Sequence, residues 1–161
     1  MLSSFLVASA VFTASAVDYQ RDKYYVANCQ DNNGKFNESN CNVQLKSDAT
    51  SGSYEAYGMY NDDVESAGWG KLWVHGSESN QGWYESGFLE GSLTSLRVFQ
   101  HFESWYAYQF GSTPPTDATL KFLEEQLEYS YKLVKLHPHD LYYNRLGDVL
   151  AQFFGILDGV N

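Results

Sequence analysis

The sequence lacks the short motifs that mark many hydrolases and nucleotide-binding enzymes. It contains no G-x-S-x-G turn, no phosphate-binding glycine loop and no H-E-x-x-H zinc motif. Basic residues are few, with 10 against 20 acidic ones and a formal net charge of −10, which disfavours electrostatic binding to nucleic acid. No internal run approaches the ~20 apolar residues of a membrane span. The residues therefore define no catalytic constellation, no nucleic-acid partner and no transmembrane segment.

Cysteine is scarce as well, with only Cys29 and Cys41 in the chain. In a secreted chain, two cysteines at this separation predict one disulfide that closes a polar loop. The alternative is a catalytic thiolate, which needs a nearby base, and no histidine lies near either cysteine in sequence. Asn37-Glu38-Ser39, the only N-x-S/T sequon, lies inside this loop, and Asn37 is the predicted glycosylation site.

The first residues resemble a secretory signal peptide. An apolar run from Leu2 to Phe12 is too short to cross a bilayer, and Ala14-Ser15-Ala16 supplies the small residues of a cleavage site. Residues 1–16 are therefore the predicted signal peptide, and residues 17–161 form a mature chain of single-domain length. A secreted location follows from this interpretation.

The first half of the mature chain has the pattern of an antiparallel sheet. Aromatic and β-branched residues predict four strands with short connections, which indicate a meander. Asn33-Gly34 favours a tight hairpin turn, and Asn61-Asp62-Asp63 predicts another turn between the last two strands. Gly68-Trp69-Gly70 is interpreted as glycines flanking a buried Trp. The predicted strands are 23–28, 42–46, 54–60 and 70–75.

The second half has the periodicity of helices. Residues 82–110 form the first predicted helix, in which Gly87 and Gly91 share a face that another element can approach closely. Thr116 is the predicted N-cap of the second helix, which ends near His137-Pro138. The third helix begins at Asp140. Its predicted inner face consists of Leu146, Val149, Leu150, Phe153 and Leu157.

His137, His139 and Asp140 resemble a metal cluster, but Pro138 interrupts them and no second ligand group follows. We interpret this segment as a connector between helices and predict no metal or other cofactor, with a zinc site as the weaker alternative. Strands followed by helices predict an α+β fold, in which an antiparallel sheet is followed by covering helices.

The stretch from Ala56 to Ser104 also carries a family resemblance. Asn61-Asp62, Gly68-Trp69-Gly70 and Gly87-Phe88-Leu89-Glu90-Gly91 stand in the order and spacing of the phospholipase B-like family, and residues 142–161 provide a second similar stretch. The resemblance implies a secreted or lysosomal N-terminal-nucleophile hydrolase with a four-layered αββα sandwich. It also implies acyl ester or amide hydrolysis of lipid-like substrates by a precursor that cleaves itself.

The resemblance carries no catalytic residue into this chain. The family's nucleophile is a Cys that opens a Cys-Ser segment downstream of the region matched here, and Cys29 and Cys41 lie too early to correspond to it. We therefore expect the N-terminal part of such a hydrolase, with the downstream chain of the same precursor as its partner. The alternative is a short secreted non-catalytic binding protein on the same scaffold, in which paired aromatics such as Tyr142-Tyr143 contact lipid or glycan.

Overall fold

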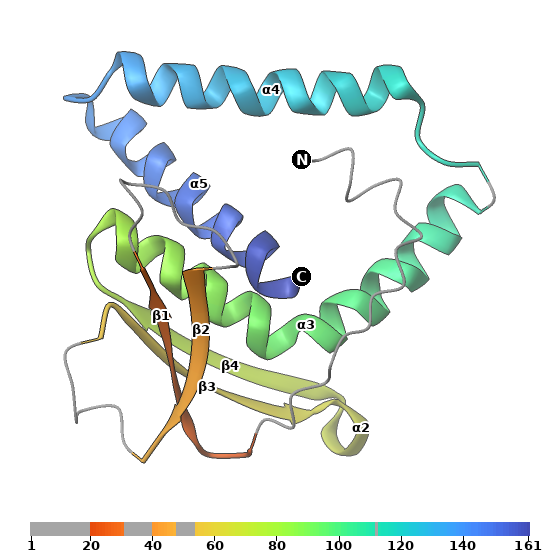
Figure 1. Cartoon of the computed structure of the whole chain (residues 1–161). Coiled ribbons are helices and arrows are strands. Elements are labelled where there is room, and N and C mark those ends of the chain that lie inside the picture. The colour runs from red at the N-terminus through yellow and green to blue at the C-terminus, as the bar shows by residue number, and fades with distance from the viewer. Residues whose placement is uncertain (1–19, 31–39, 48–53, 112) are drawn as a thin grey trace. The chain divides into compact units, whose positions relative to one another are not determined.

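The computed structural model describes residues 20–30, 40–47, 54–111 and 113–161. The predicted signal peptide, the Asn33-Gly34 turn and the Asn37 sequon lie outside these residues. The described chain is an α+β structure with a four-stranded antiparallel sheet and three long helices, as the sequence predicted (Figure 1). None of the described helices is long and apolar enough to cross a membrane.

The strand order differs from the meander expected from the sequence. The sheet runs β2-β1-β3-β4, so β1 lies between β2 and β3 and pairs with both. β2 occupies one edge of β1, and β3 then pairs with the opposite edge of β1 instead of with β2. The strands are β1 (Tyr24–Cys29), β2 (Cys41–Lys46), β3 (Ala56–Asp63) and β4 (Trp69–Gly76).

The connection between β3 and β4 corrects a second expectation. Asn61, Asp62 and Asp63 do not form a turn, because they continue β3 and pair with the start of β4. The chain reverses instead through one helical turn, α2 (Val64–Ala67), which ends at Gly68 in the left-handed conformation with φ 76°. Glycine adopts this conformation without the Cβ clash that other residues meet.

The three long helices are α3 (Asn80–Phe110), α4 (Asp117–Leu136) and α5 (Leu141–Val160). Thr116 caps α4 as predicted, since its Oγ1 accepts a hydrogen bond from Thr119 N at 3.2 Å. The expected end of α4 near His137 is also confirmed. Asp140 accepts a hydrogen bond from Tyr142 N at 2.8 Å and so satisfies a free amide at the start of α5.

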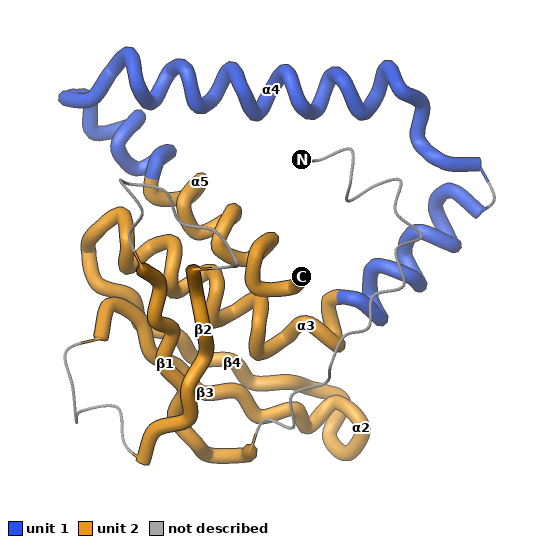
Figure 2. Tube along the Cα trace, in the orientation of Figure 1, with its two compact units in different colours: residues 1–13, 99–147 blue, residues 14–98, 148–161 orange. Residues whose placement is uncertain are grey.

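The chain divides into two compact units, coloured separately in Figure 2. Their described parts are residues 99–147 for the first unit, apart from residue 112, and residues 20–98 and 148–161 for the second, apart from its own gaps. Both α3 and α5 contribute one end to each unit. The sheet and nearly all of the buried core belong to the second unit.

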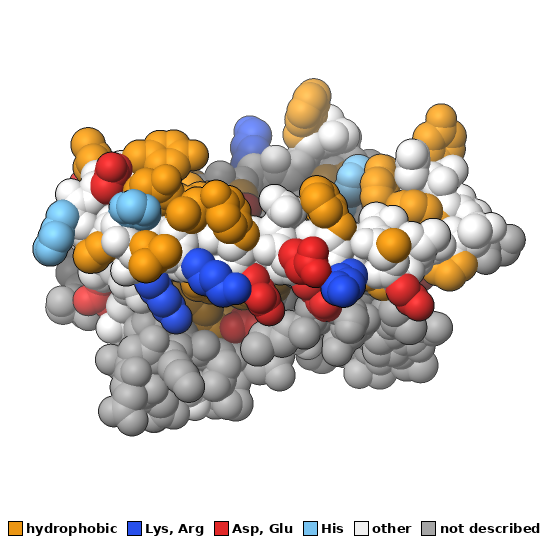
Figure 3. All heavy atoms as spheres, turned by 90° about the horizontal axis from the view of Figure 1, so that it is seen from above, with side chains coloured by type: hydrophobic (Ala, Val, Ile, Leu, Met, Phe, Trp, Pro, Cys, Tyr) orange, Lys and Arg blue, Asp and Glu red, His pale blue; other side chains and the backbone are white. Residues whose placement is uncertain are grey.

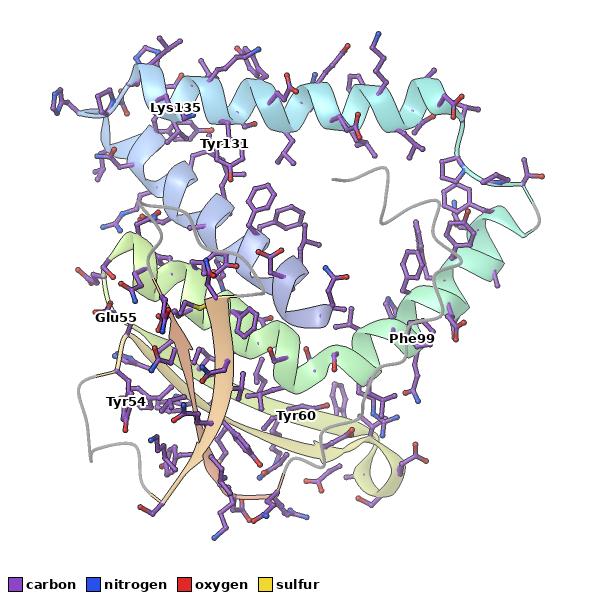
Figure 4. All side chains as sticks on the ribbon, in the orientation of Figure 1. Tyr54, Glu55, Tyr60, Phe99, Tyr131 and Lys135 are labelled. Atoms are coloured by element: carbon purple, nitrogen blue, oxygen red, sulfur yellow. A yellow bond between two sulfur atoms is a disulfide. The ribbon has the colours of Figure 1, made fainter. Side chains whose placement is uncertain are left out.

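In the second unit, α3 packs against both the sheet and α5. Leu89 is 0% exposed, and a Cβ at Gly58 on β3 would lie 3.2 Å from Leu89 Cδ2. Tyr60 lies on the same face of β3, close to α3 (Figure 4). The core that joins the two layers consists of Tyr25, Ala27, Cys29, Tyr60, Tyr84, Phe88, Leu89 and Leu93.

The opposite side of α3 packs on α5 through interleaved glycines. A Cβ at Gly87 or Gly91 would collide with the carbonyl groups of Gln152 or Ile156 on α5. The prediction that Gly87 and Gly91 allow a close approach is therefore confirmed, and the approaching element is a helix. Gly155 and Gly159 on α5 play the same part toward the backbone of α3. The two helix backbones meet at a distance that no side chain could occupy.

The predicted inner face of α5 is partly wrong. Val149 is 61% exposed and Phe153 is also exposed, whereas Leu150 and Gly155 are buried and Phe154 packs on the core. The buried face of α5 is rotated from the predicted one because Gly155 must meet α3. Glycine does not count in a pattern of apolar side chains, so the periodicity could not predict this. Packing at the glycines, rather than the positions of the largest side chains, determines the rotation of α5.

The described part of the first unit consists of helices with little buried surface. Leu120 is its only buried hydrophobic residue among those described. Rings of Phe102, Trp105, Tyr106 and Phe110 contact one another along the end of α3. Figure 3, which looks down on α4, shows hydrophobic side chains exposed among the charged ones.

Candidate functional site

The densest group of polar contacts among the described residues lies where α3 begins. Ser79 caps the helix, because its Oγ accepts a hydrogen bond from Gly82 N at 2.9 Å. The carboxylate of Glu55, just before β3, accepts hydrogen bonds from the hydroxyls of both Ser77 and Ser79. Figure 4 shows Glu55 at this end of the sheet. A carboxylate placed there complements the positive end of the helix dipole.

One turn further along α3, Glu85 lies in the core with only 2% of its surface exposed. Its Oε1 accepts a hydrogen bond from Cys29 N at 2.9 Å and another from Gln81 Nε2 at 2.8 Å. Gln81 Nε2 also lies 3.3 Å from the carbonyl oxygen of Cys29. The side chains of Glu85 and Gln81 therefore hold the last residue of β1 against the start of α3.

The two carboxylates of this cluster have pKa shifts of opposite sign. Burial raises the pKa of Glu85 above its ordinary value, against the smaller opposing effects of Gln81 and the Cys29 amide. The hydroxyls of Ser77 and Ser79 lower the pKa of Glu55. The negative charge of Glu55 adds to the upward shift at Glu85. A carboxyl group with a raised pKa in a hydrophobic site is the kind of group that can act as a general acid.

The geometry assigns the Glu85 cluster a structural role. The disulfide between Cys29 and Cys41, expected from the sequence, is present, so neither sulfur is available as a thiolate nucleophile. The Cys residues also face each other directly across β1 and β2. Glu85 therefore holds the disulfide-bearing end of the sheet against α3.

A second charged group closes the opposite end of the sheet. Arg97 on α3 donates to Asp62 at 2.7 Å and to Glu65 at 3.2 Å. This ion pair is the largest cause of the lowered pKa of Asp62. Desolvation raises the pKa of the neighbouring Tyr60. Glu85 thus attaches α3 to one end of the sheet, and Arg97 attaches α3 to the other end.

The segment between α4 and α5 is a connector, as predicted. His137 follows the last residue of α4, its backbone N–H bonds to Leu133 O, and its ring stacks on Tyr143 at 4.6 Å between centroids. Asp140 accepts its hydrogen bond from the backbone of α5. Within the described residues, no group of three or more His, Cys, Asp or Glu side chains is arranged to hold a metal ion.

Trp69 contradicts the expectation of a buried tryptophan between two glycines, because it is 75% exposed. Gly68 instead ends α2, and Gly70 makes room for the Tyr60 ring, whose hydroxyl would lie 3.1 Å from a Cβ placed at position 70. The glycines thus serve the turn and a neighbouring strand. Sequence spacing alone gave no sign of which aromatic residue they accommodate.

Trp69 belongs to a broader aromatic surface on the sheet face that α3 does not cover. Gly58 faces α3, so its neighbours Tyr57 and Met59 face the other way, together with their partners His75 and Trp73 on β4. Tyr57 contacts Trp73 at 5.4 Å and His75 at 4.9 Å between ring centroids. Trp73 remains 47% exposed. One face of the sheet is therefore packed, and the other presents aromatic side chains to solvent.

Comparison with known proteins agrees with this architecture. The sequence profile of the family described as Phospholipase B matches residues 56–161. A protein named Phospholipase B from Crotalus adamanteus is 30% identical over 128 residues, which cover 76% of this chain and 23% of the relative. Phospholipase-B 81 from Drysdalia coronoides is 33% identical over 111 residues, or 65% and 20% of the two chains. Human Phospholipase B-like 1 is 30% identical over 111 residues, which cover 65% of this chain and 20% of the relative.

The fold gives the structural class of the chain, and the matches give its family. The fold is an α+β layer structure, and the matched region contains β3, β4 and the three long helices. The chain belongs to the phospholipase B family, which confirms the resemblance found in the sequence. It spans about a fifth of the length of the curated relatives it matches.

Sequence reasoning missed Glu85, Gln81 and the glycines of α5. A glutamate in the first turns of a helix normally favours the helix dipole from a solvated position, so nothing in its local pattern indicated burial. The spacing of Gly155 and Gly159, four residues apart like Gly87 and Gly91, was a signal that could have paired the two helices.

Proposed function

We propose that this chain is the N-terminal segment of a phospholipase B-like hydrolase that cleaves acyl ester or amide bonds in lipid-like substrates. In this proposal, a downstream part of the same precursor supplies the Cys nucleophile. Family membership and the partial coverage of the relatives support this reading. The chain then contributes a scaffold rather than the reacting group.

The observation that carries the proposal is the two-sided sheet. α3 and α5 cover one face, whereas the aromatic face of Tyr57, Trp73 and His75 is exposed. A four-layered αββα sandwich requires a second sheet on such a face, because stacked sheets bury side chains between them. The described sheet and its helices correspond to two of the four layers, and the aromatic face is the proposed contact with the third.

We further propose that the chain enters the secretory pathway and is secreted or lysosomal. Residues 1–16 would be its signal peptide and Asn37 its glycosylation site. The Cys29–Cys41 disulfide supports an oxidising compartment, and Asn37 lies between these two cysteines in sequence. Expression in a secreting cell should yield a product that begins at Val17 and loses mass on removal of N-linked glycans. An Asn37→Gln variant should not show this mass loss.

Complementation tests the catalytic proposal. The chain would be co-expressed with a Crotalus phospholipase B that lacks the region equivalent to this segment, and fatty-acid release from phosphatidylcholine vesicles would be measured. We expect hydrolysis only from the pair, and none when Gly155→Val replaces the parent chain. Hydrolysis by the 161-residue chain alone would contradict the proposal. A correctly folded pair without activity would favour the non-catalytic binding protein.

A further inference from the structure

The outer edge of β4 has the features of a strand that pairs with another strand. β4 is the last strand of the sheet and extends over eight residues from Trp69 to Gly76. Its register with β3 is continuous from Asp63–Trp69 to Ala56–Gly76, so no bulge interrupts it. Six of its residues are exposed and the other two are half-buried.

The register identifies which backbone groups point outward. Ser77 N donates to Glu55 O at 2.7 Å, so this pair belongs to the hydrogen-bonded set of the antiparallel ladder. Alternation then makes Trp73 and His75 bond inward to β3, whereas Gly70, Leu72 and Val74 direct their N–H and C=O groups away from it. No described strand pairs with this edge of β4, and the outward groups form a regular row along it.

Natural sheets protect such edges with prolines, bulges, several lysines or a covering element. β4 contains no proline and only one lysine, Lys71. Its other exposed side chains are largely apolar or aromatic. Trp69 is 75% exposed, Trp73 47% and Leu72 37%. The edge therefore carries little of the usual protection against pairing.

We propose that the β4 edge is an interaction surface that pairs antiparallel with β4 of a second copy of this chain. A two-fold axis at Leu72 places Gly70 of each copy opposite Val74 of the other. The outward backbone groups of both strands then bond to each other. The result is one continuous sheet through both copies, with α3 of each copy on the same face.

Side-chain chemistry selects this register over its neighbours. With the axis at Leu72, Lys71 lies opposite Trp73 of the second copy, which is a cation–π pair, and Trp69 lies opposite His75. An axis at Lys71 would place two lysines directly opposite each other, which destabilises a sheet. An axis at Trp73 would place Trp69 opposite Ser77, where it has no aromatic partner. Of these three axes, only the one at Leu72 avoids opposed lysines and gives each of Trp69, Trp73 and His75 a partner in the second copy.

Sedimentation velocity of the secreted, disulfide-bonded chain tests the proposal. We expect a concentration-dependent equilibrium between monomer and dimer. Leu72→Pro removes only an outward N–H, so the β3–β4 ladder stays complete while the two central bonds of the dimer are lost. The dimer dissociation constant should rise about tenfold. Leu72→Val, which keeps the N–H, should change it much less. A monomer at every concentration would overturn the proposal.

Cysteine cross-linking tests the register and does not depend on the proline variant folding. Both native cysteines are in the disulfide, so an introduced cysteine is the only free thiol. Leu72→Cys places two thiols across the axis on residues whose Cα atoms are about 5.5 Å apart, within reach of a disulfide. His75→Cys, exposed on the same strand, lies roughly 20 Å from its equivalent. We expect a covalent dimer from the first variant and not from the second. Equal cross-linking, or none, would overturn the Leu72 axis.

Discussion

The two units of the chain differ in what holds them together. In the second unit, a sheet, the start of α3 and the end of α5 share a core and an interlocked helix pair. In the first unit, the described helices bury Leu120 alone among their large hydrophobic side chains. Helices depend mainly on tertiary packing for stability. The second unit therefore has a packed core, whereas the described helices of the first unit depend more on local interactions.

The local interactions of α4 illustrate this difference. The helix has a Thr116 cap and two i,i+4 pairs, Lys121–Glu125 and Glu128–Lys132, each at 3.8 Å between charged atoms. Exposed pairs of this kind contribute ~0.3–0.5 kcal/mol each. Tyr131 and Leu136 lie on its exposed surface. Under the proposed function, the rest of the precursor would cover such side chains.

Among the variants that test this difference between the two units, Gly155→Val should have the largest effect on stability. A side chain at position 155 would collide with the Tyr84 carbonyl and the Phe88 amide, and neither backbone group can move without displacing α3. We expect a loss of more than ~3 kcal/mol in the free energy of unfolding, from overpacking that no rotamer relieves. Urea unfolding followed by circular dichroism measures it.

Gly147→Ala on the same helix is the matched control. Its Cβ would lie 3.2 Å from Val134 Cγ1, which is the tip of a side chain and not a backbone atom. Alanine also favours a helix over glycine by ~1 kcal/mol. The free energy of unfolding should change by less than ~1 kcal/mol. Equal losses from both variants would mean that the glycines of α5 matter only for helix propensity.

A pair of leucine truncations gives the next largest effect. Leu89→Ala empties a position that is 0% exposed between the sheet and α3, and should cost ~3 kcal/mol. Leu123→Ala removes the same atoms from an exposed position on α4 and should cost less than ~1 kcal/mol. The same unfolding experiment compares them. Similar costs would show that the first unit has a core comparable to that of the second.

The sequence predicted the elements that depend on local signals. The strands, the Thr116 cap, the end of α4 and the disulfide each follow from a nearby pattern, and each is present. Gly87 and Gly91 also predicted a close approach, although not which element approaches. The position of β1 inside the sheet was missed, because hairpin signals do not say on which side the next strand pairs.

Contacts between distant parts of the sequence bring the residues of the candidate site together, so no local pattern could predict the site. Glu85 meets Cys29 across 56 positions of sequence, and Tyr84 donates to Asp158 across 74. The exposure of Trp69 and Val149 was missed for the same reason, since apolar character was taken as a sign of burial. In a chain with one uncovered sheet face, apolar residues also mark the surfaces that other layers would cover.

A smaller effect is expected from Glu85→Gln, measured as the pH dependence of unfolding. Burial raises the folded pKa of Glu85 above the ordinary 4.5. Its contribution to stability is therefore fully present below the unfolded pKa and is lost as the pH rises through the folded pKa. The amide keeps the acceptor for the Cys29 amide but does not titrate. The parent should thus lose stability relative to the variant as the pH rises from about 4.5.

Glu55→Gln provides the opposite sign. The serine hydroxyls lower the folded pKa of Glu55, so its contribution is present above the unfolded pKa and is lost as the pH falls through the folded one. The parent should lose stability relative to this variant in acid. Unfolding in urea at several pH values measures both curves. Parallel curves for the parent and Glu85→Gln would contradict the assignment of a raised pKa to Glu85.

The smallest effect, and the one most specific to the first unit, is expected from Thr116→Ala. Losing the hydrogen bond from Thr119 N should cost α4 ~1 kcal/mol. Because α4 has little tertiary packing among the described residues, this cost should increase local opening and leave global unfolding nearly unchanged. Amide hydrogen exchange should therefore accelerate over the first turns of α4 but not at Leu89 or Leu93. Equal acceleration at these core amides would instead show that the two units unfold together, and the contrast between them would then be one of burial but not of stability.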